Sequence, residues 1–167
     1  FKAANDFIWK YNLETYNWVQ YKNIISRPVI GHSIFIYDNI MYSFFGLTNC
    51  SENKISSISN ITNFDLGTQV WLEDIRLQLD ESLLGLIYHS AYLNGSEIWI
   101  HGGLYINNSY EIFVSNFIYV FNLITAKWKR IEYGGPKLYL HSSVIINDSF
   151  LVIGGFSLTK NINEQIE

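Results

Sequence analysis

Apolar and polar residues alternate along several short stretches of the chain, and this period of two predicts β-strands. The clearest examples are Phe7, Trp9, Tyr11 and Leu13, and later Phe117, Tyr119, Phe121 and Leu123. Short β-branched or aromatic runs, such as Ile34 to Tyr37 and Val144 to Ile146, are also typical of strands. The best helical candidate, Asp80 to Leu84, is too short to be stable alone. The pattern therefore predicts an all-β chain.

Turn residues separate the strand-like runs at regular places. Asp38-Asn39, Asn94-Gly95 and Asn147-Asp148 each stand between two such runs, and pairs of this kind favour tight hairpin turns. A polar stretch follows the second strand, at residues 47–57 and 104–111, and we interpret it as a loop. A third strand and a turn containing Thr then lead to a fourth strand that begins with Trp. The pattern predicts four antiparallel strands per unit.

The same landmark residues recur along the chain. An aromatic residue, Asn or Asp, Leu, any residue, Thr, two further residues and Trp occur in this order three times, ending at Trp18, Trp71 and Trp128, which are 53 and 57 residues apart. A His-Ser pair precedes the first strand of each unit, and a glycine follows each His after 14 residues. These pairs are His32 with Gly46, His89 with Gly103, and His141 with Gly155. Such spacing indicates one backbone path used repeatedly, and a period of roughly 50 residues is typical of propellers and arrays.

The repeat predicts how the chain is divided. Residues 1–24 are expected to supply the last two strands of one blade, residues 30–76 and 87–133 two blades of four strands, and residues 139–155 the first two strands of another. A propeller closes with about four to eight blades. Residues 1–167 are therefore expected to be a partial ring, which further blades of the same chain or a second copy would close.

The composition and net charge argue against some classes of binding partner. Hydrophobic residues make up 49% of the chain, aromatic residues 17% and charged residues only 16%, which suits heavily packed sheets. The net charge of −4, with scattered Lys and Arg, offers no basic surface and argues against a nucleic-acid partner. Since no apolar run reaches roughly 18 residues, we expect no membrane-spanning helix.

Two features point to different compartments. Cys50 is the only cysteine, so no internal disulfide can form, which favours a reducing, cytoplasmic location. Five Asn-x-Ser/Thr sequons favour the alternative of secretion with glycosylation. They begin at Asn49, Asn60, Asn94, Asn107 and Asn147. The sequons at Asn94 and Asn147 also have a simpler explanation, because both coincide with expected hairpin turns.

Together these landmarks resemble the kelch repeat over nearly the whole chain, with a long unit similar to those of muskelin and host-cell factor. The matching features are the His-Ser pairs, the double glycines Gly102-Gly103 and Gly154-Gly155 that end the second strand, the aromatic residue with Asn/Asp-Leu, and the Trp that opens the fourth strand. The resemblance implies a kelch-type β-propeller, of which about three four-stranded blades are present. Two features depart from the pattern: Phe45-Gly46 replaces a glycine pair, and the third strand near residues 58–64 is polar and expected to be irregular.

The recurring residues are best explained as structural. We expect each Trp to be buried between adjacent blades. The glycines allow positive φ and close backbone approach, and because a strand follows them they are not a phosphate loop. We expect each recurring His to bond neighbouring backbone, and His101 to be a local packing choice. Because no Cys, Asp or Glu stands at ligand spacing beside the histidines, and Cys50 lies in a variable polar stretch, we predict no metal site, no cofactor and no catalytic residues.

Variable loops on a rigid scaffold remain as the candidate site. Tyr and Arg often supply binding energy at interfaces. The candidate partner-binding residues are Arg27, Tyr105, Tyr110, Lys137 and Tyr139. The sequence thus favours a protein-protein interaction module. The alternative is a propeller enzyme or a secreted carbohydrate-binding kelch protein whose site lies in blades outside these residues.

Overall fold

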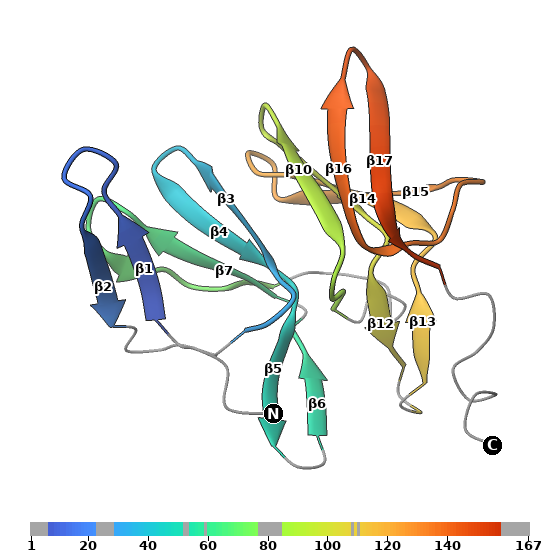
Figure 1. The fold of residues 1–167 in the computed structure, drawn as a ribbon, viewed down its shortest axis with the longest axis horizontal. Helices are drawn as coiled ribbons and strands as arrows, with labels where there is room; N and C mark the ends of the chain where they lie inside the picture. Colours follow the sequence, from blue (N-terminus) through green and yellow to red (C-terminus); the bar gives the residue numbers. More distant parts are fainter. Residues whose placement is uncertain are drawn as a thin grey trace.

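A computed structural model gives the fold and describes residues 7–22, 29–51, 54–58, 60–76, 85–107, 109 and 111–157. Every regular element among these residues is a β-strand, and all strand pairs are antiparallel. Figure 1 shows the sheets standing side by side in sequence order, from β1 and β2 at one end to β16 and β17 at the other. The expected all-β architecture is confirmed.

Two sheets contain all the strands of a blade. The first has the order β3-β4-β7-β8, with β9 also pairing with β7; its strands are β3 (Ser33–Tyr37), β4 (Ile40–Phe44), β7 (Asn60–Asp65), β8 (Val70–Trp71) and β9 (Ile75–Arg76). The second has the order β10-β11-β14-β15; its strands are β10 (Ser90–Asn94), β11 (Glu97–His101), β14 (Phe117–Asn122) and β15 (Lys127–Glu132).

The expected irregularity of the third strand in the first sheet is wrong. Strand β7 pairs with β4 without interruption, because Ile61 and Phe64 are buried and anchor it to the core. The irregular strand is the fourth, which divides into β8 and β9. Between them, the side-chain amide of Asn63 donates to the backbone oxygen of Glu73 at 3.2 Å, so a buried polar side chain occupies the break.

The sheets at the two ends have two strands each. They are formed by β1 (Phe7–Tyr11) with β2 (Trp18–Lys22), and by β16 (Tyr139–Ile146) with β17 (Ser149–Phe156). Both sheets expose large apolar side chains. Trp18 is 63% exposed in the first, and Ile153 is 71% exposed in the second.

The stretches that we interpreted as polar loops are β-hairpins, so that interpretation is wrong. They contain β5 (Leu47–Ser51) with β6 (Lys54–Ser57), and β12 (Leu104–Ile106) with β13 (Ile112–Val114). The second hairpin forms because two short apolar runs flank residues 107–111, and each of its three residue pairs joins apolar side chains. Each complete sheet therefore carries an additional two-stranded hairpin between its second and third strands.

The backbone conformation of the turns between the first and second strands explains which residue types occupy these turns. Asp38 and Asn39 have φ of 49° and 61°, and Asn147 and Asp148 have φ of 47° and 62°. These left-handed values are typical of two-residue hairpin turns and are tolerated best by Asn, Asp and Gly. In the second sheet the turn is one residue later than expected: Asn94 pairs with Glu97 as a strand residue, and Gly95, with φ of 59°, begins the turn.

The repeated Asn or Asp before Leu closes the turn between third and fourth strands. Asn12 Oδ1 accepts hydrogen bonds from the backbone of Glu14 and Thr15, both at 2.8 Å. Asp65 and Asn122 accept the equivalent pairs of backbone N–H groups. Because a side-chain oxygen replaces a backbone acceptor here, Asn and Asp are the residues favoured at this position.

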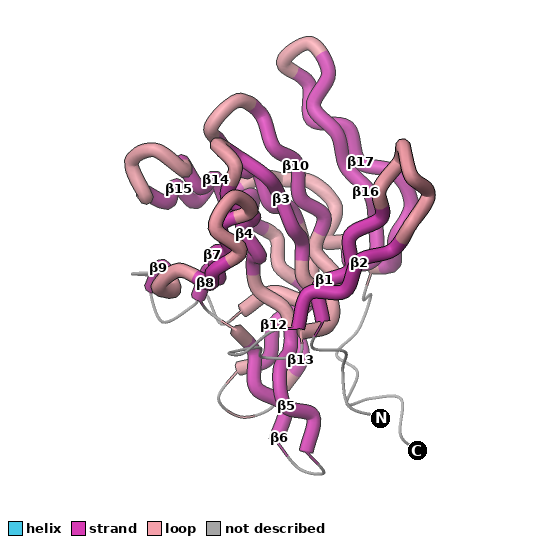
Figure 2. Tube along the Cα trace, turned by 90° about the vertical axis from the view of Figure 1, so that its left-hand side faces the viewer, coloured by secondary structure: helices cyan, strands magenta, loops and turns pink. Residues whose placement is uncertain are grey.

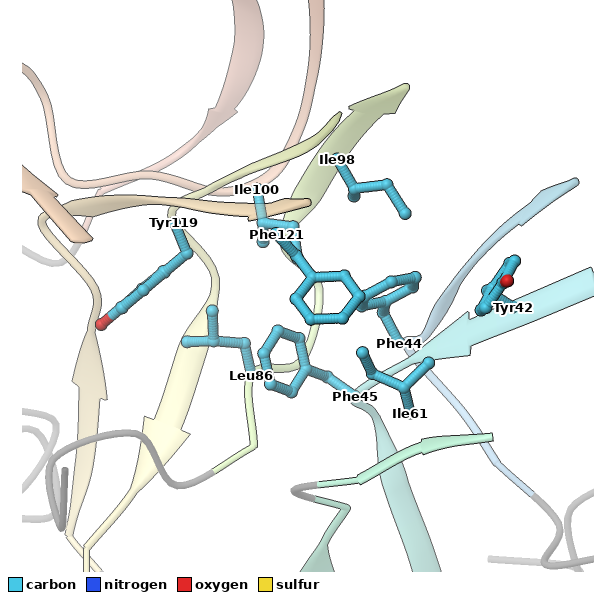
Figure 3. Packing of buried hydrophobic residues seen from close by; sticks show 9 residues of the cluster. All are labelled: Tyr42, Phe44, Phe45, Ile61, Leu86, Ile98, Ile100, Tyr119 and Phe121. Atoms are coloured by element: carbon cyan, nitrogen blue, oxygen red, sulfur yellow. The ribbon is translucent and has the colours of Figure 1, made fainter. Parts of the chain in front are cut away.

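The core lies between the two complete sheets. Its buried side chains are Tyr42, Phe44, Phe45, Ile61, Leu86, Ile98, Ile100, Tyr119 and Phe121, shown in Figure 3. Trp128 of β15 crosses to the first sheet, where its ring centroid lies 6.3 Å from that of Phe44 and 5.9 Å from that of Phe45. The interpretation of this Trp as a packing residue between neighbouring blades agrees with these contacts.

The other two recurring Trp residues are placed differently. Trp71 is half-buried, with its ring centroid 5.1 Å from that of Phe64. Trp18 is 63% exposed. Among the described residues its ring contacts only the rings of its own hairpin, tilted against Tyr11 and T-shaped with Trp9. The expected burial of Trp18 is therefore wrong in this structure, because no described sheet packs on that face of β1 and β2.

The His-to-glycine spacing has a steric cause. A Cβ added to Gly103 would lie 2.8 Å from Cβ of His89, and one added to Gly155 would lie 2.6 Å from Cβ of His141. Gly46 is enclosed in the same way by Val29, the oxygen of Ile30 and His32. All three glycines have positive φ. The glycine thus lets the end of the second strand pass directly over the start of the first.

Phe45 stands where the other units have the first glycine of a pair, and the fold accommodates this larger residue. Phe45 has φ of 58°, where the equivalent Gly102 and Gly154 have 64° and 74°. Its side chain is 1% exposed and packs against Trp128 and His89 of the next sheet. The burial of a large aromatic ring between blades offsets the roughly 1–2 kcal/mol that a left-handed conformation costs a side-chain-bearing residue.

Backbone hydrogen bonds join the successive sheets. The N–H of Tyr88 donates to the oxygen of Gly31 at 3.2 Å, and the N–H of Leu140 donates to the oxygen of Tyr88 at 2.9 Å. A second pair repeats beside them, from Gly46 to Leu86 at 3.0 Å and from Gly103 to Leu138 at 2.8 Å. The same two bonds therefore join the first complete sheet to the second, and the second to the β16–β17 sheet, in addition to side-chain packing.

Candidate binding face

The two additional hairpins leave the sheets at the same end. Ile30 bridges Leu47 at the base of the first hairpin, and Ile87 bridges Leu104 at the base of the second. Figures 1 and 2 both show β5–β6 and β12–β13 extending in one direction from the body of the sheets. We call this end the hairpin face; it consists of the two hairpins and of residues 29–31, 85–88 and 133–140. The opposite end, with residues 38–39, 95–96, 123–126 and 147–148, is called the turn face.

The hairpin β12–β13 is held by an aromatic pair. The rings of Tyr105 and Phe113 stack with centroids 5.3 Å apart and planes 19° from parallel. Both side chains are half-buried, and burial raises the pKa of Tyr105 above its usual value of 10.0. Tyr105 therefore stays a neutral phenol at physiological pH and supports the hairpin by packing.

The side chain of Asn107 forms three hydrogen bonds near the end of the same hairpin. Its side-chain oxygen accepts hydrogen bonds from the backbone N–H groups of Ser109 and Glu111, both at 2.9 Å. Its side-chain nitrogen donates to the carboxylate of Glu111 at 2.7 Å. Glu111 and the following Ile112 are exposed. The hairpin thus presents a charged and an apolar side chain from a defined backbone.

The connection at residues 133–138 forms the adjoining part of the hairpin face. The Tyr133 hydroxyl donates to the backbone oxygen of Pro136 at 2.6 Å, which closes this segment over its own start. Lys137 is exposed on it. Tyr139 is half-buried at the beginning of β16, and its ring lies 5.8 Å from that of Phe156.

The sequence-predicted binding residues are placed as follows. Tyr105, Lys137 and Tyr139 lie on the hairpin face, although Tyr105 and Tyr139 are partly used in packing. Arg27 and Tyr110 lie outside the described residues. Sequence reasoning missed Glu111 and Ile112, since residues 104–111 were read as a loop. The two apolar runs on either side of Asn107 were the signal that could have shown the hairpin.

The recurring histidines have different environments. His32 is exposed, whereas His89 and His141 are buried. His89 lies against Phe45 with ring centroids 5.7 Å apart, and burial lowers its pKa to about 4. An imidazole in this position is neutral at physiological pH and acts as a packing side chain.

His141 belongs to a chain of hydrogen bonds that sequence reasoning did not find. His101 Nδ1 lies 2.7 Å from His141 Nε2, and His101 Nε2 bonds the Tyr133 hydroxyl. Because the only hydroxyl proton of Tyr133 is donated to Pro136, His101 must donate from Nε2 and accept at Nδ1, so His141 donates from Nε2. His101 therefore links two blades and is more than the local packing choice expected for it.

Burial keeps this chain neutral. His101 is 1% exposed and His141 7% exposed. Burial, with a further contribution from His141, lowers the pKa of His101 to about 4, and burial lowers the pKa of His141. Among the residues that the structure describes, no three His, Cys, Asp or Glu side chains come together as metal ligands. The arrangement is suited to joining blades, and we assign it no chemical step.

The comparison with protein families decides the identity of the fold. The profile described as the attractin/LZTR1 β-propeller matches residues 2–167. The chain belongs to the attractin/LZTR1 β-propeller family. This confirms the β-propeller expected from the repeat and its similarity to kelch-type propellers.

Two similar proteins extend this result. The chain is 25% identical over 165 residues to the putative protein tag-53 of Caenorhabditis elegans, covering 92% of the chain and 12% of that protein. The solved structure of YjhT superposes with a TM-score of 0.71 at 17% identity, covering 89% of the chain and 50% of YjhT. The likeness to YjhT shows the fold alone. In the described part of the chain, no helix of a length and hydrophobicity that would span a bilayer is present.

Proposed function

We propose that this chain is a protein-binding scaffold of the attractin/LZTR1 propeller family, which holds a partner on its hairpin face and catalyses no reaction. The observation that carries the proposal is the pair of hairpins β5–β6 and β12–β13, which project in the same direction from two successive blades. Because repeating backbone bonds fix one blade to the next, the hairpins are held in a constant relation. Rigid frames that carry projecting segments are where recognition commonly takes place.

The hairpins are better candidates than the turn face. On the turn face, residues such as Asp38, Asn39 and Asn122 are used to make the turns themselves. The hairpins, in contrast, are additions to the four-stranded blade and are not needed to complete it. The residues of the hairpins are therefore not constrained by the blade and can contact a binding partner.

The exposed chemistry of the hairpin face suits a protein surface. Glu111 and Ile112 stand next to each other on the second hairpin, and Lys137 is exposed on the adjoining connection. An apolar side chain accompanied by charges of both signs matches the mixed character of protein interfaces. Such a surface lacks the concentrated positive charge that a phosphate backbone requires.

Quantitative affinity capture from the protein's own cells tests the proposal. The full-length protein is compared with the variants Ile112→Asp on the hairpin face and Ile124→Asp on the turn face. Both side chains are exposed, so neither change should unfold the sheet. We expect Ile112→Asp to lose the specific partner and Ile124→Asp to retain it. Equal capture by all three proteins, or loss only with Ile124→Asp, would refute the assignment of the face.

A second function stays open for the whole protein, since the chain covers only a small part of its tag-53 relative. A propeller enzyme or carbohydrate-binding propeller would have its site in other blades. Metal analysis and a glycan-binding screen on the intact protein separate this alternative from the scaffold. Stoichiometric copper or iron, or a specific sugar ligand, would replace our proposal.

A further inference from the structure

Asn94 has no structural reason to be an asparagine. It is the last residue of β10 and pairs with Glu97, so it stands before the two-residue turn and not in it. The equivalent positions in the neighbouring units, five residues after the His of each His-Ser pair, are occupied by Tyr37 and Ile146. The backbone at this position therefore accepts unrelated side chains. The turn explanation that the sequence suggested for the Asn94-Gly95-Ser96 sequon does not apply.

The surroundings of Asn94 are open. Its side chain is exposed and has no hydrogen-bond partner among the described residues. A Cβ added to the adjacent Gly95 would meet nothing within 4 Å, so the space beside Gly95 is also open. Ser96 follows at the hydroxyl position of the sequon. A bulky group on Asn94 would project from the turn face without displacing any described side chain.

The other sequons differ from this one. The side-chain nitrogen of Asn107 is bonded to the Glu111 carboxylate at 2.7 Å and helps to close its hairpin. Asn147 has φ of 47° and fills a left-handed turn position, where Asp38 stands in another unit. Asn60 is half-buried within β7, and the side chain of Asn49 lies outside the described residues. Asn94 alone among the four described sequons is exposed, unbonded and not required by the backbone.

We propose that Asn94 carries an N-linked glycan. In the transfer, its side-chain amide nitrogen forms a bond to C1 of a lipid-diphosphate-linked oligosaccharide. The bond from C1 to the diphosphate oxygen breaks, the diphosphate leaves with the bonding electrons, and one amide proton passes to a base of the transferring enzyme. The Asn-x-Ser pattern on an accessible surface is what this modification requires.

The position of the glycan is compatible with the proposed binding surface. The β10–β11 turn lies on the turn face, whereas partners are proposed to bind the hairpin face at the other end of the sheet. The glycan would leave that face free. The proposal also places the chain in the secretory pathway, against the cytoplasmic location that the single Cys50 favours, and it does not depend on the scaffold function.

Site-resolved mass spectrometry tests the proposal on the full-length protein from its own cells. Treatment with peptide N-glycosidase F in heavy-oxygen water converts a glycosylated Asn to isotopically labelled Asp. We expect the label at Asn94. Recovery of the Asn94 peptide in unmodified form, whether because the protein stays in the cytoplasm or because other sequons are used, overturns the proposal.

Matched variants separate the glycan from effects on folding. Asn94→Gln and Ser96→Ala should each remove one deglycosylation-sensitive step in gel mobility, whereas Ser96→Thr preserves the sequon and should retain it. Because Asn94 makes no hydrogen bond with described residues, deglycosylated wild type and Asn94→Gln should melt at the same temperature. An unchanged mobility step in both Asn94→Gln and Ser96→Ala would contradict the assignment.

Discussion

His101 Nδ1 lies 2.7 Å from His141 Nε2, across the junction between the sheet that contains β11 and the one that contains β16. The two residues are 40 positions apart in the chain, and neither is exposed. The bond holds only while His101 Nδ1 is unprotonated and His141 Nε2 carries a hydrogen. The junction is therefore sensitive to the protonation of these rings.

We expect the folded state to lose stability as the pH falls. His89 and His101 have folded pKa values of about 4, below the ordinary value of 6.5, so between these values the unfolded chain binds protons that the folded chain does not. Each such group lowers the free energy of unfolding by up to about 1.4 kcal/mol per pH unit in this window, and its full contribution is present above pH 6.5. Urea titrations at pH 7, 5.5 and 4.5 measure the effect.

The variant His101→Phe is the control for this dependence. Phe44 occupies the equivalent position of the first sheet, so the ring fits the backbone. We expect a loss of about 1–3 kcal/mol at pH 7, because the N–H of His141 loses its buried acceptor. The variant should also depend less on pH. Parallel pH profiles for wild type and His101→Phe would show that the pair does not govern acid stability.

The glycines after the second strand should not tolerate a methyl group. In Gly103→Ala the new Cβ would lie 2.8 Å from Cβ of His89 at φ of 88°, so overpacking and backbone strain together should cost about 2–5 kcal/mol. Gly95→Ala is the matched control. It has a positive φ but open space, and should cost only about 1–2 kcal/mol. Equal melting temperatures for the two variants would remove the steric explanation.

The turn between third and fourth strands should depend on a side-chain oxygen and not on the amide. Asn122→Ala removes the acceptor for two backbone N–H groups and should cost about 1 kcal/mol or more. Asn122→Asp should cost less than about 0.5 kcal/mol, because Asp65 fills the same role in the first sheet. Chemical denaturation of both variants gives the comparison. The same loss for Asp as for Ala would mean that the oxygen is not the stabilising atom.

The architecture could be predicted from the sequence because its recurring residues meet local conformational and steric requirements. Asn122 is required by its turn, and Gly103 by the close passage of His89, and both constraints return in every unit. A residue needed for the same steric reason in each blade leaves a fixed spacing. That spacing can be recognised in the amino-acid sequence alone.

The site was harder to predict because it depends on contacts between blades and on hairpins whose sequences differ from one unit to the next. The pairing of His101 with His141 joins two units, and no spacing rule connects residues on neighbouring blades. The hairpin that contains Tyr105 was not recognised in the sequence because its tip is polar, although Tyr105 and Phe113 lie in paired apolar runs. Local patterns thus give the blade, whereas contacts between blades require the structure.

Burial decides which recurring Trp stabilises the fold. Trp128→Ala should cost about 3–5 kcal/mol, because the ring packs on Phe44 and Phe45 of the first sheet and a cavity would remain. Trp18→Ala should cost less than about 1 kcal/mol, because this ring is 63% exposed. Thermal unfolding of both variants is a direct comparison. Undiminished stability of Trp128→Ala would show that the recurring indole is not a packing residue.

The apolar faces of the two end sheets should control association. Residues 1–167 produced alone leave Trp18, Ile153 and Phe156 more than half exposed, and water does not favour so much uncovered apolar surface. We expect this segment to form dimers or larger species, because further blades or a second copy must cover both faces. Light scattering coupled to gel filtration measures the mass. Trp18→Glu combined with Ile153→Lys should shift the segment towards monomer, and a monodisperse, stable wild-type monomer would show that these faces need no cover.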